Sequence, residues 1–176
     1  ENDLNVASIH AYIYPIKKEL PQTFFLRGAD CWGWATWSRA WNTFEHDANK
    51  LIVELKEKNL VSMFDYNDSV NNFKMLNKQA EGKIDSWAIR WHASAFLKNM
   101  FTLYPGKSFV SNIGNDLSGT HTLATSVYDV ELNDSKMDLI KIDTKEVPGT
   151  RMEIEKYFKA IRKNYFQKIF NKLFGT

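Results

Sequence analysis

The chain has 176 residues, and its 23 basic and 21 acidic side chains leave a formal charge of only +2. Hydrophobic residues make up 44% of it and charged residues 25%, which excludes a disordered or fibrous protein. No apolar stretch approaches the roughly 18 residues that a membrane-spanning helix needs. Cys31 is the single cysteine, so the sequence contains no disulfide framework and no cysteine-based metal site.

In chain order, the hydrophobic pattern predicts one mixed α/β unit. The predicted elements are a strand over 6–14, a connection over 16–28, helices over 36–44, 51–60, 68–79 and 87–98, strands over 101–104, 126–132 and 139–142, and a last helix after residue 149. The helix over 87–98 has the strongest signals. It follows the capping-type residues Asp85 and Ser86 and contains no Gly or Pro.

Aromatic residues make up 14% of the chain, and four of the six tryptophans fall within residues 32–41. Most of these rings are expected to fill the core, Trp37 and Trp41 among them. Aromatic faces also bind the apolar faces of sugars and bases. The tryptophan cluster is therefore a candidate binding segment as well as a core segment.

Positive charge is concentrated near the C-terminal end. Residues 151–176 contain seven basic and two acidic side chains, so this segment is +5 while the rest of the chain is −3. Helical spacing of apolar residues, from Ile154 through Phe158 and Ile161, predicts that 151–176 is a basic amphipathic helix that follows the unit over 1–150. Two interpretations stay open: the helix lies on an anionic membrane surface, or it packs on the domain. Nucleic acid is not expected as a partner, because the remaining chain is net acidic and shows no binding motif.

Three segments of the sequence are candidates for catalysis or ligand binding. The sequence contains no Gly-rich phosphate loop, no His-Glu-x-x-His, no Gly-x-Ser-x-Gly and no Cys-x-x-Cys. The segments that stand out are 30–41, which contains the tryptophan cluster, 84–91, at the start of a predicted helix, and 112–122, a polar loop with glycines.

The order of these segments resembles bacterial family 2 glycosyltransferases of the GT-A fold, in the part that follows their acidic metal motif. The run 31–37 (CWGWATW), followed by Trp41, is similar to that group's Trp-Gly-Trp-Ala-Thr-Trp signature. The runs 86–91 (SWAIRW) and 112–121 (NIGNDLSGTH) resemble its later landmarks, and 9–15 (IHAYIYP) resembles the strand region before them. The resemblance extends over about two-thirds of the chain.

The resemblance implies that residues 1–150 are the C-terminal, acceptor-side half of a GT-A domain, with a short mixed or antiparallel sheet and flanking helices. It implies an inverting transfer from a nucleotide-sugar donor to a glycan or lipid-linked acceptor, as in cytoplasmic enzymes of bacterial cell-surface polysaccharide biosynthesis. A divalent metal, Mn²⁺ or Mg²⁺, would have its main ligands in a nucleotide-binding half that precedes this chain. The isolated chain is then expected to be inactive and to self-associate.

Such a transfer needs a carboxylate that accepts the proton of the acceptor hydroxyl. The resemblance favours Asp85, at a helix start beside Trp87, as this base; the alternative is that Asp85 only caps the helix. Asp30, just before the Trp-Gly-Trp turn, is the second candidate. Asp116 is the third, as a base or a substrate-binding residue, and the alternative is that it holds its Gly-rich loop by a turn hydrogen bond.

The other candidate residues would bind substrate or metal. Trp32 and Trp34 flank Gly33, which lets the backbone turn sharply or approach a ligand, and at most one of the two rings is expected to face that ligand. Arg90 would pair with a phosphate, or with a carboxylate as a structural ion pair. His121 would complete the metal site or contact the diphosphate, with a structural role as the equal alternative. The alternative function is a non-catalytic carbohydrate-binding or interaction module that uses the same tryptophans.

Overall fold

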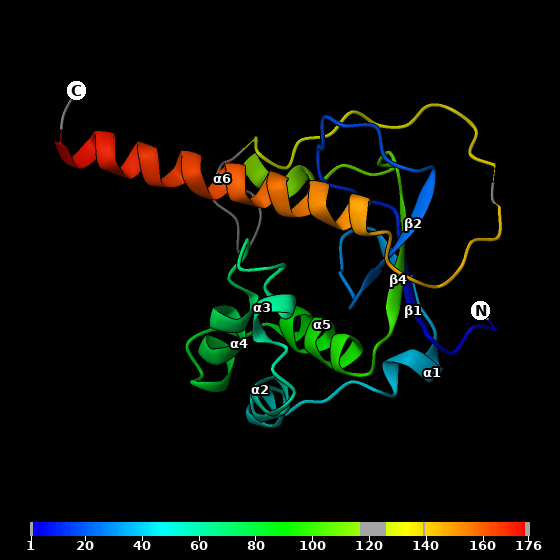
Figure 1. Ribbon diagram of the computed structural model, residues 1–176, viewed down its shortest axis with the longest axis horizontal. Helices are drawn as coiled ribbons and strands as arrows, with labels where there is room; N and C mark the ends of the chain where they lie inside the picture. The colour runs from blue at the N-terminus through cyan, green and yellow to red at the C-terminus, as the bar shows by residue number, and fades with distance from the viewer. Residues whose placement is uncertain (1, 117–125, 139, 175–176) are drawn as a thin grey trace.

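A mixed β-sheet organises the described part of the chain. The computed structural model describes residues 2–116, 126–138 and 140–174, with residues 115, 116 and 164–174 given by their backbone alone. Its elements in chain order are β1 (Val6–His10), β2 (Thr23–Arg27), β3 (Trp34–Thr36), α1 (Ser38–Trp41), α2 (Ala48–Glu57), α3 (Val61–Phe64), α4 (Asn72–Ala80), α5 (Trp87–Leu97), β4 (Phe101–Pro105), the short 3-10 helix η1 (Ile113–Asp116) and α6 (Pro148–Phe174). Helices α2 to α5 lie together on one side of the sheet, and α6 runs above these helices in the view of Figure 1, with its first turns beside β2 and β4.

The described strands form a four-stranded sheet in the order β2-β4-β1-β3. Strand β1 pairs in parallel with β4, whereas the β1–β3 and β2–β4 pairs are antiparallel. The predicted mixed α/β class, with a short mixed sheet and flanking helices, is confirmed at this level. The helix predicted over 87–98 and the strand predicted over 101–104 are also present, as α5 and β4.

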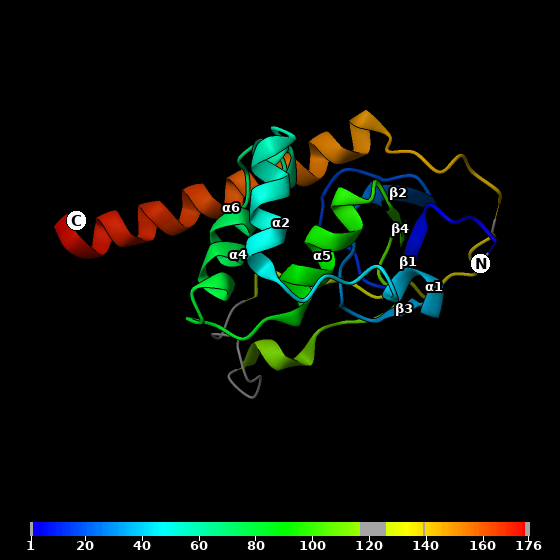
Figure 2. The same cartoon turned by 90° about the horizontal axis from the view of Figure 1, so that it is seen from below.

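Three parts of the strand prediction are wrong. The strand predicted over 6–14 ends at His10, as β1. Residues 23–27, predicted as part of a connection, form β2. Positions 23–26 of this strand are all buried, so it lacks the alternation by which a half-buried strand is recognised. Residues 126–132 and 140–142 form no strand, although their apolar residues alternate. They belong to a segment that runs round the side of the sheet away from α2 to α5, outside the strand ladder (Figures 1 and 2).

The helix predicted over 36–44 is also corrected. Its first residue, Thr36, ends β3, and the helix covers only Ser38–Trp41. Pairing of β3 with β1 is a tertiary contact, and it overrides the helical spacing of the tryptophans in this segment. Trp41, predicted to be a core residue, is 38% exposed.

The sheet face that meets α5 contains a buried hydroxyl pair. Ser8 Oγ on β1 lies 2.6 Å from Thr102 Oγ1 on β4, and both residues are fully buried. Thr102 donates its proton to the carbonyl oxygen of Gly28 at 2.9 Å, so it accepts the proton of Ser8. These bonds attach the segment after β2 to the middle of the sheet.

Three apolar clusters join the layers. One lies among α2 to α5, and it includes Leu55, Phe64 and Leu76, which are all 0% exposed. A second joins α5 to β1 around Trp91, and a third joins α6 to β2 and β4 around Ile154. The first turns of α6 are therefore part of the core. Among the described residues, no helix combines the length and the apolar composition needed to cross a bilayer.

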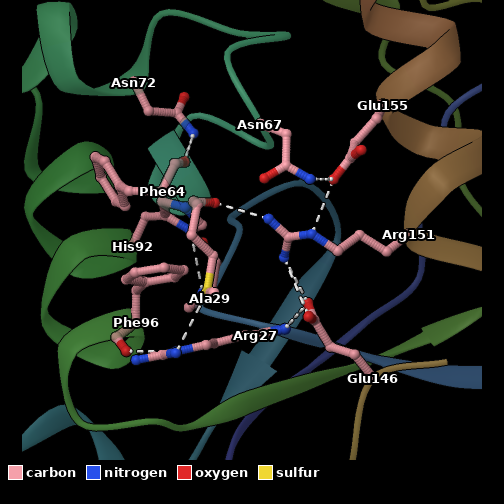
Figure 3. Close-up of polar contacts among 11 residues, drawn as sticks. Arg27, Ala29, Phe64, Asn67, Asn72, His92, Phe96, Glu146, Arg151 and Glu155 are labelled. Carbon is pink, nitrogen blue, oxygen red and sulfur yellow. Dashed lines mark hydrogen bonds and ion pairs between the residues drawn. The ribbon is translucent and has the colours of Figure 1, made fainter. Parts of the chain in front are cut away.

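Arg151, near the start of α6, joins α6 to three other parts of the chain (Figure 3). Its Nε donates to Glu155 Oε1 at 3.0 Å, and its Nη1 donates to both carboxylate oxygens of Glu146 at 2.9 and 3.1 Å. Its Nη2 donates to the carbonyl oxygen of Met63 at 2.7 Å. Glu146 also accepts the backbone N–H of Arg27, at the end of β2, at 2.8 Å. The guanidinium thus connects α6, the chain before it, α3 and the sheet.

Replacing this guanidinium is expected to destabilise the fold strongly. The variant Arg151→Met leaves two largely buried carboxylates without their cation, which should lower the free energy of unfolding by about 3 kcal/mol. Urea unfolding followed by tryptophan fluorescence measures the loss. The control Lys145→Met removes an ion pair with Asp143 in which both side chains are more than two-thirds exposed, at 71% and 79%. It should cost much less than Arg151→Met does, because water already solvates both charges, and equal losses in the two variants would contradict the role given to Arg151.

Candidate ligand pocket

A pocket of about 800 Å³ lies between the sheet, α4, α5 and α6. Its walls come from residues 29–32 after β2, residues 66–72 between α3 and α4, the first turns of α5, and residues 158–162 of α6. Its volume is in the range typical of small-molecule sites. We call it the Asp30 pocket, after the acidic residue among its described lining residues.

Asp30 is held by two donors. Its Oδ2 accepts the hydroxyl proton of Tyr14 at 3.0 Å, and its Oδ1 accepts the backbone N–H of Cys31 at 2.7 Å. Burial, and then the charge of Asp30, raise the pKa of Tyr14 well above its usual value, so the phenol stays a donor. A carboxylate oxygen can accept two hydrogen bonds, so both oxygens of Asp30 keep the capacity to accept a ligand hydroxyl.

Aromatic rings form much of the remaining wall. Trp32 lies edge-on to Tyr12 and to Tyr128, with ring centroids 5.0 and 5.4 Å apart. Tyr14 meets Phe158 of α6 at 4.7 Å. Largely apolar walls with a few well-placed polar groups are typical of ligand pockets. Flat rings beside a carboxylate also match the two surfaces of a sugar, whose C–H faces are apolar and whose hydroxyls donate hydrogen bonds.

His10, at the end of β1, holds the backbone of Trp32. Its Nε2 accepts the N–H of Trp32 at 2.8 Å, and its Nδ1 lies 2.8 Å from the carbonyl oxygen of Tyr12. A carbonyl oxygen can only accept, so Nδ1 bears the proton and the imidazole is neutral. Burial lowers the pKa of His10, and the nearby charge of Asp30 opposes this only in part.

His92, on α5, packs against the same segment from the helical side. Its Nδ1 lies 2.8 Å from the carbonyl oxygen of Ala29, and its ring stacks on Phe64 at 5.0 Å (Figure 3). The contact requires glycine at position 28, because Gly28 has φ of +96° and a Cβ there would come within 2.6 Å of His92 Cε1. The buried Nε2 has no hydrogen-bond partner among the described residues, and burial lowers the pKa of the ring. The backbone N–H of Ala29 also lies 3.3 Å from Nδ1, so both polar groups of Ala29 meet this nitrogen of a ring that lines the pocket.

The loop between α3 and α4 contributes a wall in a strained conformation. Tyr66, Asn67 and Asp68 have φ values of 49°, 51° and 62°, which are left-handed. Such a conformation costs roughly 1–2 kcal/mol per residue, less for Asn and Asp. Bonds to α6 hold it: Asn67 Nδ2 donates to Glu155 at 2.8 Å, and Arg162 Nη1 donates to the carbonyl oxygen of Asp68 at 2.9 Å. Backbone strain of this kind concentrates at functional sites.

Asp85 lies outside the Asp30 pocket. Its side chain is 97% exposed, and its Oδ1 is 3.7 Å from Nη2 of Arg90. The N-cap of α5 is Ser86, whose Oγ accepts the N–H of Ile89 at 3.4 Å, so the capping alternative for Asp85 is wrong. Arg90 is 17% exposed, and it also donates to the carbonyl oxygen of His46 at 3.2 Å. It does not line the Asp30 pocket.

The rings of Trp32 and Trp34 pack in different parts of the structure. Trp34 stacks on Trp87 at 5.7 Å and meets Trp91 at 6.2 Å, whereas Trp32 lines the Asp30 pocket. Between them Gly33 has φ of +57°, and a Cβ there would come within 2.6 Å of a methyl group of Val110. The turn therefore requires glycine, and it sends the two rings to opposite sides of the segment.

Two predicted site residues cannot be placed by their side chains. Asp116 is described by its backbone, as the last residue of η1, and His121 lies outside the described residues. Across the described ranges, no three or more His, Cys, Asp and Glu side chains come together as metal ligands. The Asp30 pocket by itself therefore does not fit the divalent metal that the resemblance implies. Burial raises the pKa of Cys31 to about 12, which keeps its thiol protonated and unsuited to nucleophilic attack.

Asp30 and Trp32 are marked by the sequence pattern, but most of the pocket wall is not. Tyr14 and Tyr104 follow or end the parallel strands β1 and β4, and the carboxyl ends of parallel strands share an edge. The parallel pairing of β1 with β4 therefore predicts that the two tyrosines lie near each other, but the sequence does not reveal that pairing. His10 and His92 are single histidines in apolar surroundings, and no local pattern marks them.

Comparison of the chain with protein-family models, with curated proteins and with solved structures finds no match. The function is therefore argued from two observations. One is the chemistry of the Asp30 pocket. The other is the resemblance of three sequence segments to family 2 glycosyltransferases, which are the runs 31–37, 86–91 and 112–121.

The two neutral histidines are expected to make stability depend on pH. Burial lowers the pKa of His10 and of His92 in the folded state from the usual 6.5, so the unfolded chain binds more protons in this range. Their stabilising effect is present above about pH 6.5 and is lost as the pH falls below it. Urea unfolding measured between pH 8 and pH 5 should show this loss (about pH 5–8 is where histidines titrate).

The variant His10→Gln should reduce the slope of stability against pH. His46→Gln, which changes an exposed histidine, should leave the slope unchanged. A slope that is the same in all three proteins would contradict the neutral, buried state assigned to His10.

Proposed function

We propose that the Asp30 pocket binds a saccharide and forms the acceptor side of a glycosyltransferase active site. The observation that supports this most is the half-buried carboxylate of Asp30, which keeps free acceptor capacity beside the rings of Trp32 and Tyr14. The resemblance of the three segments to GT-A enzymes supplies the reaction class. The proposal covers the acceptor only. The nucleotide-sugar donor and its Mn²⁺ or Mg²⁺ would be held by residues other than those of this pocket.

In the proposed reaction, a hydroxyl of the acceptor saccharide donates a hydrogen bond to Asp30. Its oxygen attacks the anomeric carbon of the donor sugar while the bond from that carbon to the diphosphate oxygen breaks. The proton moves to Asp30, the nucleoside diphosphate leaves, and the configuration at the anomeric carbon is inverted. The donors from Tyr14 and Cys31 would keep the carboxylate oriented during the transfer.

Asp30 suits the role of base better than Asp85 does in this geometry. Asp30 lines a pocket and is held by two donors, whereas the side chain of Asp85 is 97% exposed. Water competes with an acceptor hydroxyl at an exposed carboxylate, and general-base catalysis depends on a positioned partner. Asp85 is nevertheless the residue that the resemblance favours, so it is the natural control.

A carbohydrate-binding module without catalysis is the second candidate function. The same rings and the same carboxylate support it, because sugar binding by itself needs no proton transfer. The two candidates share the first step, which is saccharide binding in the Asp30 pocket. They differ in whether Asp30 is needed for turnover. As a transferase, the protein would act in the cytoplasmic steps of bacterial cell-surface polysaccharide synthesis.

Replacing the base should separate the two functions. In an enzyme that contains this chain, Asp30→Asn should lower transfer by roughly 10²- to 10⁴-fold, because the hydroxyl loses its proton acceptor. Acceptor affinity should change little, since an amide oxygen still accepts a hydrogen bond. Release of nucleoside diphosphate from a panel of donor sugars measures transfer. Equal turnover in Asp30→Asn and wild type, with loss in Asp85→Asn, would move the base to Asp85.

Saccharide binding by the purified chain should depend on Trp32. Isothermal titration with a panel of oligosaccharides should show binding that Trp32→Ala weakens by about tenfold, the effect of about 1.4 kcal/mol. Trp87→Ala is the matched control, because Trp87 is 43% exposed and lies outside the Asp30 pocket. A ligand whose affinity falls in Trp87→Ala and not in Trp32→Ala would place the sugar site on the other tryptophan cluster.

A further inference from the structure

The last turns of α6 leave the body of the protein. The helix has 27 residues, which corresponds to a length of about 40 Å. Its first turns are buried, with Ile154 at 0% and Arg151 at 9% exposure. Farther along, Arg162 contacts the loop between α3 and α4 through the carbonyl oxygen of Asp68. Beyond this point the helix extends away from the sheet and from α2 to α5 in both views (Figures 1 and 2).

The apolar spacing of the helix continues past the body. Between 163 and 173 the sequence has apolar or aromatic residues at 165, 166, 169, 170 and 173, and polar residues at the other six positions. At about 100° per residue, these five positions fall within an arc of about 140°. By the same spacing, Phe158, which packs against the core cluster around α6, falls within this arc, whereas Ile154 falls just outside it. The sequence of the helix thus keeps one largely apolar side beyond Arg162.

The charge of this part of the helix indicates the partner. From 156 to 174 the sequence contains six basic residues and no acidic residue. Two copies of such a helix would bring like charges together, which opposes pairing with a second copy. A helix with a basic polar side and a side of Phe, Tyr, Ile and Leu is typical of segments that lie in the headgroup region of a bilayer. Nucleic acid would neutralise the charge but would leave the apolar side in water.

We propose that residues 163–174 of α6 bind an anionic lipid surface. Their apolar side enters the headgroup region, and their basic residues face the lipid phosphates. This goes beyond the sugar-transfer proposal, because it requires nothing from the Asp30 pocket. It also has a consequence for that pocket. The same helix contributes Phe158 and Ile161 to the pocket wall, so docking would hold the pocket close to the membrane, where a lipid-linked acceptor resides.

Vesicle flotation with the purified chain tests the proposal. Vesicles of phosphatidylcholine alone should bind little protein, and vesicles that also contain phosphatidylglycerol should bind it in a salt-sensitive manner. The triple variant Lys163→Glu, Lys168→Glu and Lys172→Glu should lower binding to the anionic vesicles by at least about tenfold. The matched control reverses three exposed lysines elsewhere on the body, which are Lys17, Lys74 and Lys78, and it should bind nearly as well as wild type.

A second variant separates the apolar contribution from the charge. The double variant Phe166→Ser and Phe170→Ser keeps every basic residue, and it should weaken vesicle binding by at least about tenfold, since each buried ring adds more than 1 kcal/mol. Urea unfolding checks that the body of each variant is folded. Saccharide binding in solution, measured separately, should be the same in both variants and wild type, so the sugar-binding proposal stands or fails independently.

Three results would overturn the lipid proposal. The first is equal binding of wild type to neutral and anionic vesicles, or an equal loss in the lysine variant and its matched control. The second is a dimer of the wild type, seen by light scattering, that Phe166→Ser and Phe170→Ser convert to a monomer, which would assign the helix face to a second copy. The third is binding to duplex DNA that is tighter than binding to anionic vesicles and that the lysine variant abolishes.

Discussion

The ion network of Arg151 is the interaction on which the other features of this structure depend. Arg151, which is 9% exposed, bonds to Glu155 within α6 and connects the helix to Glu146 and to the carbonyl of Met63. Removing one partner of such a network leaves buried charge unpaired, which is far more costly than never burying it. The network therefore fixes the position of α6 relative to α3 and the sheet. The left-handed loop, bonded to Glu155, and the α6 side of the Asp30 pocket both follow from that position.

Within the pocket, burial sets the protonation of the groups around Asp30. Desolvation disfavours charge, so the pKa of Tyr14 and of Tyr104 is raised and the pKa of His10 and of His92 is lowered. The tyrosines then stay as hydroxyl donors and the histidines as neutral rings. Asp30 is left as the negative charge of the described pocket wall. Such a wall offers acceptors to hydroxyl groups and flat rings to C–H surfaces, which are the demands of a saccharide.

Apolar residues recur at helical spacing along the whole of helix α6. Near its start, apolar residues at helical spacing bury Ile154 in the core beside β2 and β4. Farther along, apolar residues still recur at helical spacing in the sequence, in a segment with basic residues and no acidic ones that extends away from the sheet. The net charge of +2 for the whole chain conceals this, because the rest of the chain is acidic. Local charge, rather than net charge, is what a surface partner meets.

The sequence predicts the mixed α/β class, the helix after Ser86 and a C-terminal helix, and it marks Asp30 and Trp32 as candidate site residues. These are local signals, carried by caps, spacing and composition, and they need no knowledge of distant contacts. The tertiary structure decided that β2 is a strand, that Trp34 and Trp32 part at Gly33, and that Asp85 lies in solvent. It also brought Tyr14, Tyr104 and His92 into the pocket wall and placed His10 against the backbone of Trp32. These residues come from separate elements, and only strand pairing and helix packing, which act between residues far apart in the chain, bring them together.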